Sequence, residues 1–239
     1  MEQQTNILFI TPPFTQLNTP YPATAYLKGF FNTLNIPTQQ IDLGIDVTLR
    51  LFSRQGFTDI FQLIEAYDFD LSENASRIVS LQNEYVKTID DTIQFLQGKN
   101  PTLAYRIISR NYLPESARFS NLEDLEWAFG ELGIQDQAKH LATLYLEDIA
   151  DLIVETIDPY FGFSRYAEKI AVAASTFDEI HDHLEEEDNL IDSLLIEELE
   201  KSLLKHQPQV VAISIPFPGN LYGALKCGQF IKSKYPHIT

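Results

Sequence analysis

Three short segments predict the strands of a parallel sheet. The first, residues 6–11, is a continuous apolar run that ends at Pro12-Pro13, and the second, residues 38–43, is a weaker strand pattern. The third run, residues 209–215, lies near the other end of the chain. Short uninterrupted apolar runs are typical of parallel strands whose two faces are both covered. We therefore expect the two ends of the chain to share one sheet.

Amphipathic helices are predicted next to these strands. Between the first two runs, apolar residues recur at helical spacing from Ala23 to Leu34, and Pro22 stands where the first turn of a helix tolerates proline. A further helix is predicted after Gly44 and another after Asn220. This succession of strand, loop and helix predicts an α/β, Rossmann-like domain with a parallel sheet in the flavodoxin-like strand order.

The segment between the second and third strands, residues 54–205, carries almost no strand pattern. It is far longer than the connections of roughly 2–6 residues that are usual in α/β units, so it needs a structure of its own. Apolar positions repeat there at helical spacing in three stretches, 78–96, 138–153 and 190–203. We expect residues 54–205 to form a large all-α insertion.

The α/β domain is accordingly expected at residues 1–53 and 206–239. A doubly wound sheet normally continues with another strand after a helix such as the one predicted to end near Tyr235. Three strands are few for such a domain, so we expect the sheet to be incomplete at its C-terminal end. The chain is then expected to be a fragment of a longer polypeptide.

Composition narrows the classes of function. The formal net charge of −17, from 34 acidic and 17 basic residues, opposes binding to nucleic acid or to an anionic membrane surface. The apolar stretches are much shorter than a membrane span and the polar start lacks a signal-peptide pattern, so we expect a cytoplasmic protein. Cys227 is the only cysteine, which excludes an intramolecular disulfide and an iron–sulfur cluster held by this chain alone.

The predicted ligand site is the carboxyl edge of the sheet, where open parallel sheets bind their ligands. Three loops should meet there, at residues 12–22, 44–46 and 214–220. Prolines stiffen two of these loops, and their aromatic and neutral polar side chains suit a large uncharged ring system. The same residues would also serve simply to end strands and cover a sheet edge. The candidate residues are Pro12, Pro13, Phe14, Gln16, Asn18, Tyr21, Pro22, Asp46, Ser214, Pro216, Phe217, Pro218, Gly219 and Asn220.

These loops also carry a resemblance to a known family. Residues 7–22, reading Ile-Leu-Phe-Ile-Thr-Pro-Pro-Phe-Thr-Gln-Leu-Asn-Thr-Pro-Tyr-Pro, resemble the opening of radical S-adenosylmethionine (SAM) enzymes with an N-terminal cobalamin (B12)-binding domain. Residues 210–222, reading Val-Val-Ala-Ile-Ser-Ile-Pro-Phe-Pro-Gly-Asn-Leu-Tyr, are similar to a later strand and loop of that domain. The resemblance implies that this region binds a corrinoid and presents it to a catalytic barrel downstream in the same polypeptide.

The chain departs from the family pattern at several motifs. The DxHxxG motif that usually supplies a histidine to cobalt is absent, and the equivalent loop holds Pro12, Pro13 and Phe14. Ser214 matches the serine of the family's SxL element, whereas Pro216 replaces its leucine. The CxxxCxxC motif is absent too, so the resemblance assigns the [4Fe–4S] cluster and SAM to the downstream domain. The radical reaction is therefore not expected of this fragment alone.

Other functions stay open on the sequence. The first strand and its proline-rich loop also look like the N-terminal half of a GT-B-like nucleotide-sugar glycosyltransferase. In a third interpretation, the helical insertion is a docking or dimerisation module without catalytic activity. A dehydrogenase is disfavoured because no GxGxxG follows the first strand. His181 and His183 suggest a metal site, but residues two apart on a helix point to different sides, which favours a solvated acidic face.

Overall fold

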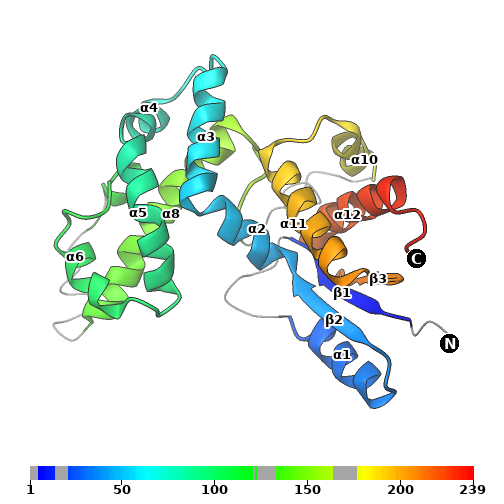
Figure 1. The fold of residues 1–239 in the computed structure, drawn as a ribbon. Coiled ribbons are helices and arrows are strands. Elements are labelled where there is room, and N and C mark those ends of the chain that lie inside the picture. The colour runs from blue at the N-terminus through cyan, green and yellow to red at the C-terminus, as the bar shows by residue number, and fades with distance from the viewer. Residues whose placement is uncertain (1–4, 14–20, 121, 123–132, 164–176) are drawn as a thin grey trace. The chain divides into compact units, whose positions relative to one another are not determined.

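The chain folds into two compact units, whose elements are labelled in Figure 1. The computed structural model describes residues 5–13, 21–120, 122, 133–163 and 177–239. The sheet unit consists of Met1–Leu49 and Tyr160–Thr239, and the helical unit consists of Arg50–Pro159. This division differs from the predicted insertion of residues 54–205, because the last helices of that segment belong to the sheet unit.

The sheet unit contains three parallel strands in the order β2-β1-β3. β1 (Ile7–Thr11) lies in the middle, paired along its whole length with β2 (Thr38–Asp42) and along its first four residues with β3 (Val210–Ile213). The predicted α/β, Rossmann-like fold with a helical insertion is thereby confirmed, and the order is that of the first three strands of flavodoxin-like sheets. The carboxyl ends of all three strands lie at one edge of the sheet.

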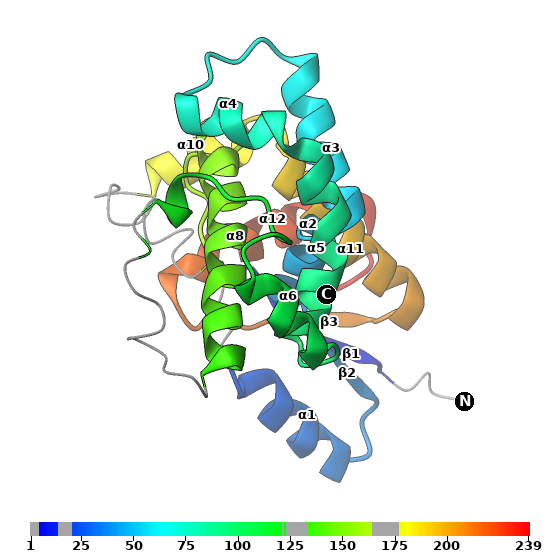
Figure 2. The ribbon, with the colours of Figure 1, turned by 90° about the vertical axis from the view of Figure 1, so that its left-hand side faces the viewer.

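Helices cover both faces of β1, as its apolar run predicted. α1 (Ala23–Thr33) lies on one face of the sheet, and α11 (Leu190–His206) and α12 (Leu221–Lys234) lie on the other (Figure 2). The ring of Phe9 points to α1, with its centroid 5.6 Å from that of Phe31. Leu8 and Ile10, which alternate with Phe9, are fully buried.

β3 is less buried than its sequence predicted. Its four apolar residues are all half-buried, because β3 lies at the edge of the sheet. Thr239 pairs with the outer side of this strand: its N–H donates to the Gln209 carbonyl at 3.0 Å, and its carbonyl accepts from the Val211 N–H at 2.8 Å. In a parallel ladder, one residue bonds to the two residues that flank its partner on the neighbouring strand, as Thr239 does here with Gln209 and Val211.

Side chains cap the starts of two helices of the sheet unit, α2 and α11. α2 (Leu43–Leu51) follows β2 without a loop, and the Asp42 carboxylate at its start accepts a hydrogen bond from the Ile45 N–H at 3.1 Å. α10 (Asp178–Glu185) precedes α11. Asn189 caps α11, because its side-chain oxygen accepts hydrogen bonds from the N–H groups of Ile191 and Asp192. A short turn, η3 (Pro218–Asn220), leads from β3 into α12.

A partly buried ion cluster joins α12 to α11 and to the residues just before α11. The Lys226 ammonium lies 2.6 Å from Asp188 and 3.8 Å from the buried Asp192. The Tyr222 hydroxyl donates to the same Asp192 carboxylate at 2.9 Å. Burial raises the pKa of Asp192, and Lys226 and Tyr222 oppose that rise. Because an unpaired charge at this depth would be costly, these contacts hold the two helices in one packing arrangement.

The helical unit is built from five α-helices and two short turns among the residues described. The stretch 78–96, where helical spacing was predicted, is helical and contains a break at Leu81, which ends α4 and precedes α5. The stretches 138–153 and 190–203 are helical as predicted. The elements of this unit are α3 (Arg54–Ala66), α4 (Glu73–Ser80), α5 (Gln82–Leu96), η1 (Pro101–Leu103), α6 (Ala104–Ile108), η2 (Ala117–Phe119) and α8 (Ile134–Thr156).

A buried carboxylate organises the helical unit. Asp148 on α8 is 0% exposed and accepts hydrogen bonds from the Tyr85 hydroxyl at 3.2 Å and from the N–H groups of Ser116 and Arg118 at 3.0 and 3.1 Å. Burial raises the pKa of Asp148, whereas the three donors lower it. This single side chain therefore ties α5 and the segment around η2 to α8.

The substitution Asp148→Ala should lower the free energy of unfolding by about 3 kcal/mol, because it leaves three buried donors without an acceptor. The matched control is Asp151→Ala on the same helix, which removes a half-exposed ion pair with Arg118 and should cost less than about 1 kcal/mol. Urea unfolding followed by circular dichroism measures both losses. Equal losses in the two variants would contradict the role given to Asp148.

Candidate functional site

The loops that follow β1 and β3 meet at the carboxyl edge of the sheet. The Asn220 side chain donates from Nδ2 to the Pro12 carbonyl at 2.8 Å. The rings of Tyr21 and Phe217 pack edge to face, with centroids 5.8 Å apart. Two segments that are about two hundred residues apart in the chain are thus in direct contact, as the strand-end rule predicted.

α12 approaches the first loop so closely that only glycine fits at the point of contact. A Cβ atom on Gly223 would lie 2.6 Å from the Pro13 carbonyl oxygen and 3.2 Å from two carbons of the Pro13 ring. Real Cβ atoms do not come this near to a backbone oxygen. The absence of a side chain at Gly223 therefore allows the helix and the loop to approach this closely.

Asn220 presents an unused polar atom at this junction. The residue is 0% exposed, and its Oδ1 has no hydrogen-bond partner among the residues that the structure describes. A buried acceptor left without a donor costs about 1–3 kcal/mol.

The structure describes eleven of the fourteen predicted site residues. Phe14, Gln16 and Asn18 lie outside the described residues. Asp46 lies in the first turn of α2, where burial and the carboxylates of Glu198 and Asp42 raise its pKa. Of the rest, Pro12, Pro13, Gly219 and Asn220 are buried, Ser214 and Pro216 are half-buried, and Tyr21, Pro22, Phe217 and Pro218 are exposed.

A cavity of about 350 Å³ opens where β1 and β2 end beside the first turn of α1. Among the described residues that were predicted for the site, Tyr21 and Pro22 line this cavity. The other lining residues were missed because they occupy ordinary strand and helix positions; the available signal was that Thr11 and Asp42 are polar and end their strands. The lining residues are Thr11, Tyr21, Pro22, Thr24, Ala25, Gln40, Ile41 and Asp42.

The polar groups of this cavity are buried and in part unused. Thr11 and Thr24 are 2% and 6% exposed, and neither hydroxyl makes a hydrogen bond within the described part of the chain. Burial raises the pKa of Asp42, while the backbone N–H groups of Ile45 and Gly44 lower it. The cavity therefore contains hydrogen-bonding capacity that the fold itself does not use.

A second cavity, of about 650 Å³, lies in the helical unit beside the start of α4 and η2. Its polar lining is already engaged: Asn74 accepts from Ser116 and Ala117, and Arg77 donates to the Glu115 carbonyl. Since these bonds are internal to the unit, the cavity is explained by packing of α4 against the segment around η2.

The described residues were searched for a metal-binding cluster, a reactive thiol and a membrane-spanning helix. No cluster of three or more histidine, cysteine or acidic side chains there is arranged to hold a metal ion. His183 contacts Glu186 at 2.8 Å, whereas His181 is exposed. Cys227 is buried, which raises its thiol pKa to about 12, so it has the character of a packing residue. None of the described helices is long and apolar enough to cross a membrane.

Gly223→Ala should lower the free energy of unfolding by about 2 kcal/mol, because the new methyl group must push the Pro13 carbonyl away. Gly228→Ala is the matched control on the same helix, where a Cβ meets no atom within 4 Å. That change should stabilise the protein by about 0.5–1 kcal/mol, as expected for glycine to alanine inside a helix. Thermal and urea unfolding of both variants measure the difference, and a neutral Gly223→Ala would show that the contact is loose.

Similarity to known proteins does not add to this picture. In comparisons of the chain with protein-family models, with curated protein sequences and with solved structures, no match was found. The resemblance to cobalamin-binding regions therefore depends on residues 7–22 and 210–222, and the function has to be argued from the geometry of the edge loops.

Proposed function

We propose that this chain is the N-terminal cobalamin-binding-type module of a B12-dependent radical SAM enzyme, in which it presents a corrinoid to a catalytic barrel downstream in the same polypeptide. The observation that carries the proposal is the contact between the loops after β1 and β3, through Asn220 with Pro12 and through Tyr21 with Phe217. These contacts lie in the two segments that resemble the family, residues 7–22 and 210–222.

The described part of the edge fits a corrinoid in its chemistry. A corrin is a broad, flat ring bordered by amide side chains, which need apolar faces and neutral hydrogen-bond partners. Tyr21 and Phe217, 36% and 54% exposed, offer aromatic surface to such a ring, and the buried Asn220 holds their loops together through its bond to Pro12. We infer that these two aromatic side chains would hold the cofactor by the face of its ring.

Cobalt itself would receive no imidazole from these loops. Residues 12–22 and 214–220 contain no histidine. The loops would therefore orient the ring and shield one side of it from water, without ligating the metal. When bound, the corrinoid supplies a methyl group or a redox-active cobalt centre. The [4Fe–4S] cluster and SAM would belong to the downstream barrel, and the proposal expects a cytoplasmic enzyme.

Titration with hydroxocobalamin, followed by visible absorbance and by retention of the corrinoid after gel filtration, tests the proposal. Tyr21→Ala and Phe217→Ala should each weaken binding about fivefold to tenfold, because each removes one aromatic face from the edge. Tyr26→Ala is the control, since it removes an aromatic ring that is 78% exposed on α1 and does not line the cavity at the edge. Its affinity should match that of the unmodified chain.

Two results would count against the proposal. One is a titration with no spectral change and no retained corrinoid. The other is binding that Tyr26→Ala weakens as much as Phe217→Ala does, since that would show nonspecific adsorption to exposed aromatic residues.

A further inference from the structure

We propose that the cavity beside β1, β2 and α1 binds a ribose, as part of a nucleoside, through its neighbouring hydroxyl groups. This inference does not depend on the corrinoid proposal: the two share only Tyr21, the groups that carry this inference are Thr11, Thr24 and Asp42, and it is tested with a different ligand. It is carried by the unused hydroxyls of Thr11 and Thr24, by the position of Asp42, and by the size and charge of the cavity.

The two threonines are polar groups for which the described fold provides no partner. Thr11, at the last position of β1, and Thr24, in the first turn of α1, are both more than nine-tenths buried and both line the cavity. Neither hydroxyl bonds to a described residue. A hydroxyl group donates one hydrogen bond and accepts up to two, so this pair complements the hydroxyls of a sugar.

Asp42 supplies a fixed acceptor. It ends β2, and its carboxylate is anchored by the N–H groups of Ile45, at 3.1 Å, and of Gly44. A carboxylate has about four lone-pair positions, so roughly two are left to accept from ligand hydroxyls. An acidic residue at the corresponding strand end is the group that accepts from ribose hydroxyls in dinucleotide-binding folds.

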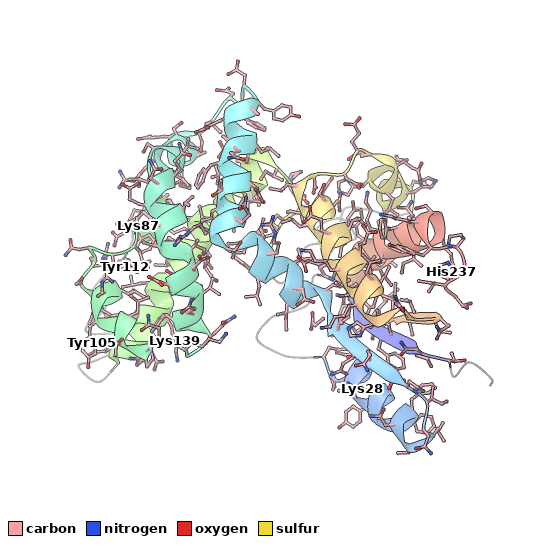
Figure 3. All side chains as sticks on the ribbon, in the orientation of Figure 1. Lys28, Lys87, Tyr105, Tyr112, Lys139 and His237 are labelled. Atoms are coloured by element: carbon pink, nitrogen blue, oxygen red, sulfur yellow. The ribbon has the colours of Figure 1, made fainter. Side chains whose placement is uncertain are left out.

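The charge of the cavity favours a neutral ligand over an anion. The first turn of α1 has no side-chain cap, and free N–H groups at a helix start attract phosphate. However, a phosphate would lie beside the Asp42 carboxylate, and no lysine or arginine lines the cavity. Lys28, the basic residue of α1 that is labelled in Figure 3, is not among the lining residues.

The size of the cavity agrees with a nucleoside. A volume of about 350 Å³ is at the lower end of the roughly 300–1,000 Å³ that small-molecule sites occupy. Tyr21, which lines the cavity, offers an aromatic face against which a base or the apolar face of a sugar can stack. A corrin ring is much larger than this space, so the cavity is a separate subsite.

Adenosine, titrated by isothermal calorimetry with 2′-deoxyadenosine and inorganic phosphate in parallel, tests the inference. Adenosine should bind, 2′-deoxyadenosine should bind about tenfold more weakly, and phosphate should not compete. Asp42→Asn should weaken adenosine about tenfold while leaving the fold intact, because asparagine caps a helix as well as aspartate does. Thr11→Val, which keeps the shape and removes the hydroxyl, should also weaken it.

Asp182→Asn is the control. It removes an exposed carboxylate of the same unit that does not line the cavity, so adenosine affinity should stay within about twofold. Adenosine affinity should also fall on acidification, beginning above pH 3.8, since the raised pKa of Asp42 causes its carboxylate to protonate earlier than in a free chain.

Three outcomes would overturn the inference. They are no adenosine binding at about 10 mM, equal affinity for adenosine and 2′-deoxyadenosine, and equal effects of Asp42→Asn and Asp182→Asn. Competition by inorganic phosphate would instead identify an anion site at the start of α1.

Discussion

The close packing of α12 against the loop after β1 is the constraint on which the carboxyl edge depends. Gly223 leaves no room for a side chain beside the Pro13 carbonyl, and the Asn220 amide bonds to Pro12 one residue earlier. Because β1 is the middle strand, the direction in which its chain leaves the sheet decides where the following residues can lie. The contact between Tyr21 and Phe217 and the cavity beside Thr11 both occur at this edge.

Buried carboxylates serve different purposes in different parts of the molecule. Asp148 is satisfied by three donors in the helical unit, and Asp192 is paired with Lys226 and Tyr222 in the sheet unit. The hydrogen bonds and ion pairs of both carboxylates stabilise the packing of helices. Asp42 is less enclosed: it caps α2 and also lines a cavity, which leaves part of its hydrogen-bonding capacity for a ligand.

The sheet and its edge could be predicted because their signals are local. The run before Pro12 has the composition of a covered strand, and the strand-end rule then brings the Pro12 loop to that of Phe217. The boundary of the insertion could not be predicted, because the apolar stripe of α11 shows that the helix is buried but not against which core. The cavity was missed for a similar reason: nothing in the identity of Thr11 or Thr24 shows that its hydroxyl will lack a partner.

Hydrogen exchange measured with and without hydroxocobalamin tests most directly whether the edge loops act as one corrinoid-binding surface. We expect slower exchange of the backbone N–H groups in residues 21–26 and 214–223 together, with no change in the helical unit. Protection of only one loop would contradict a shared site. Protection confined to the helical unit, or none at saturating cobalamin, would contradict the assignment of the edge as the corrinoid-binding surface.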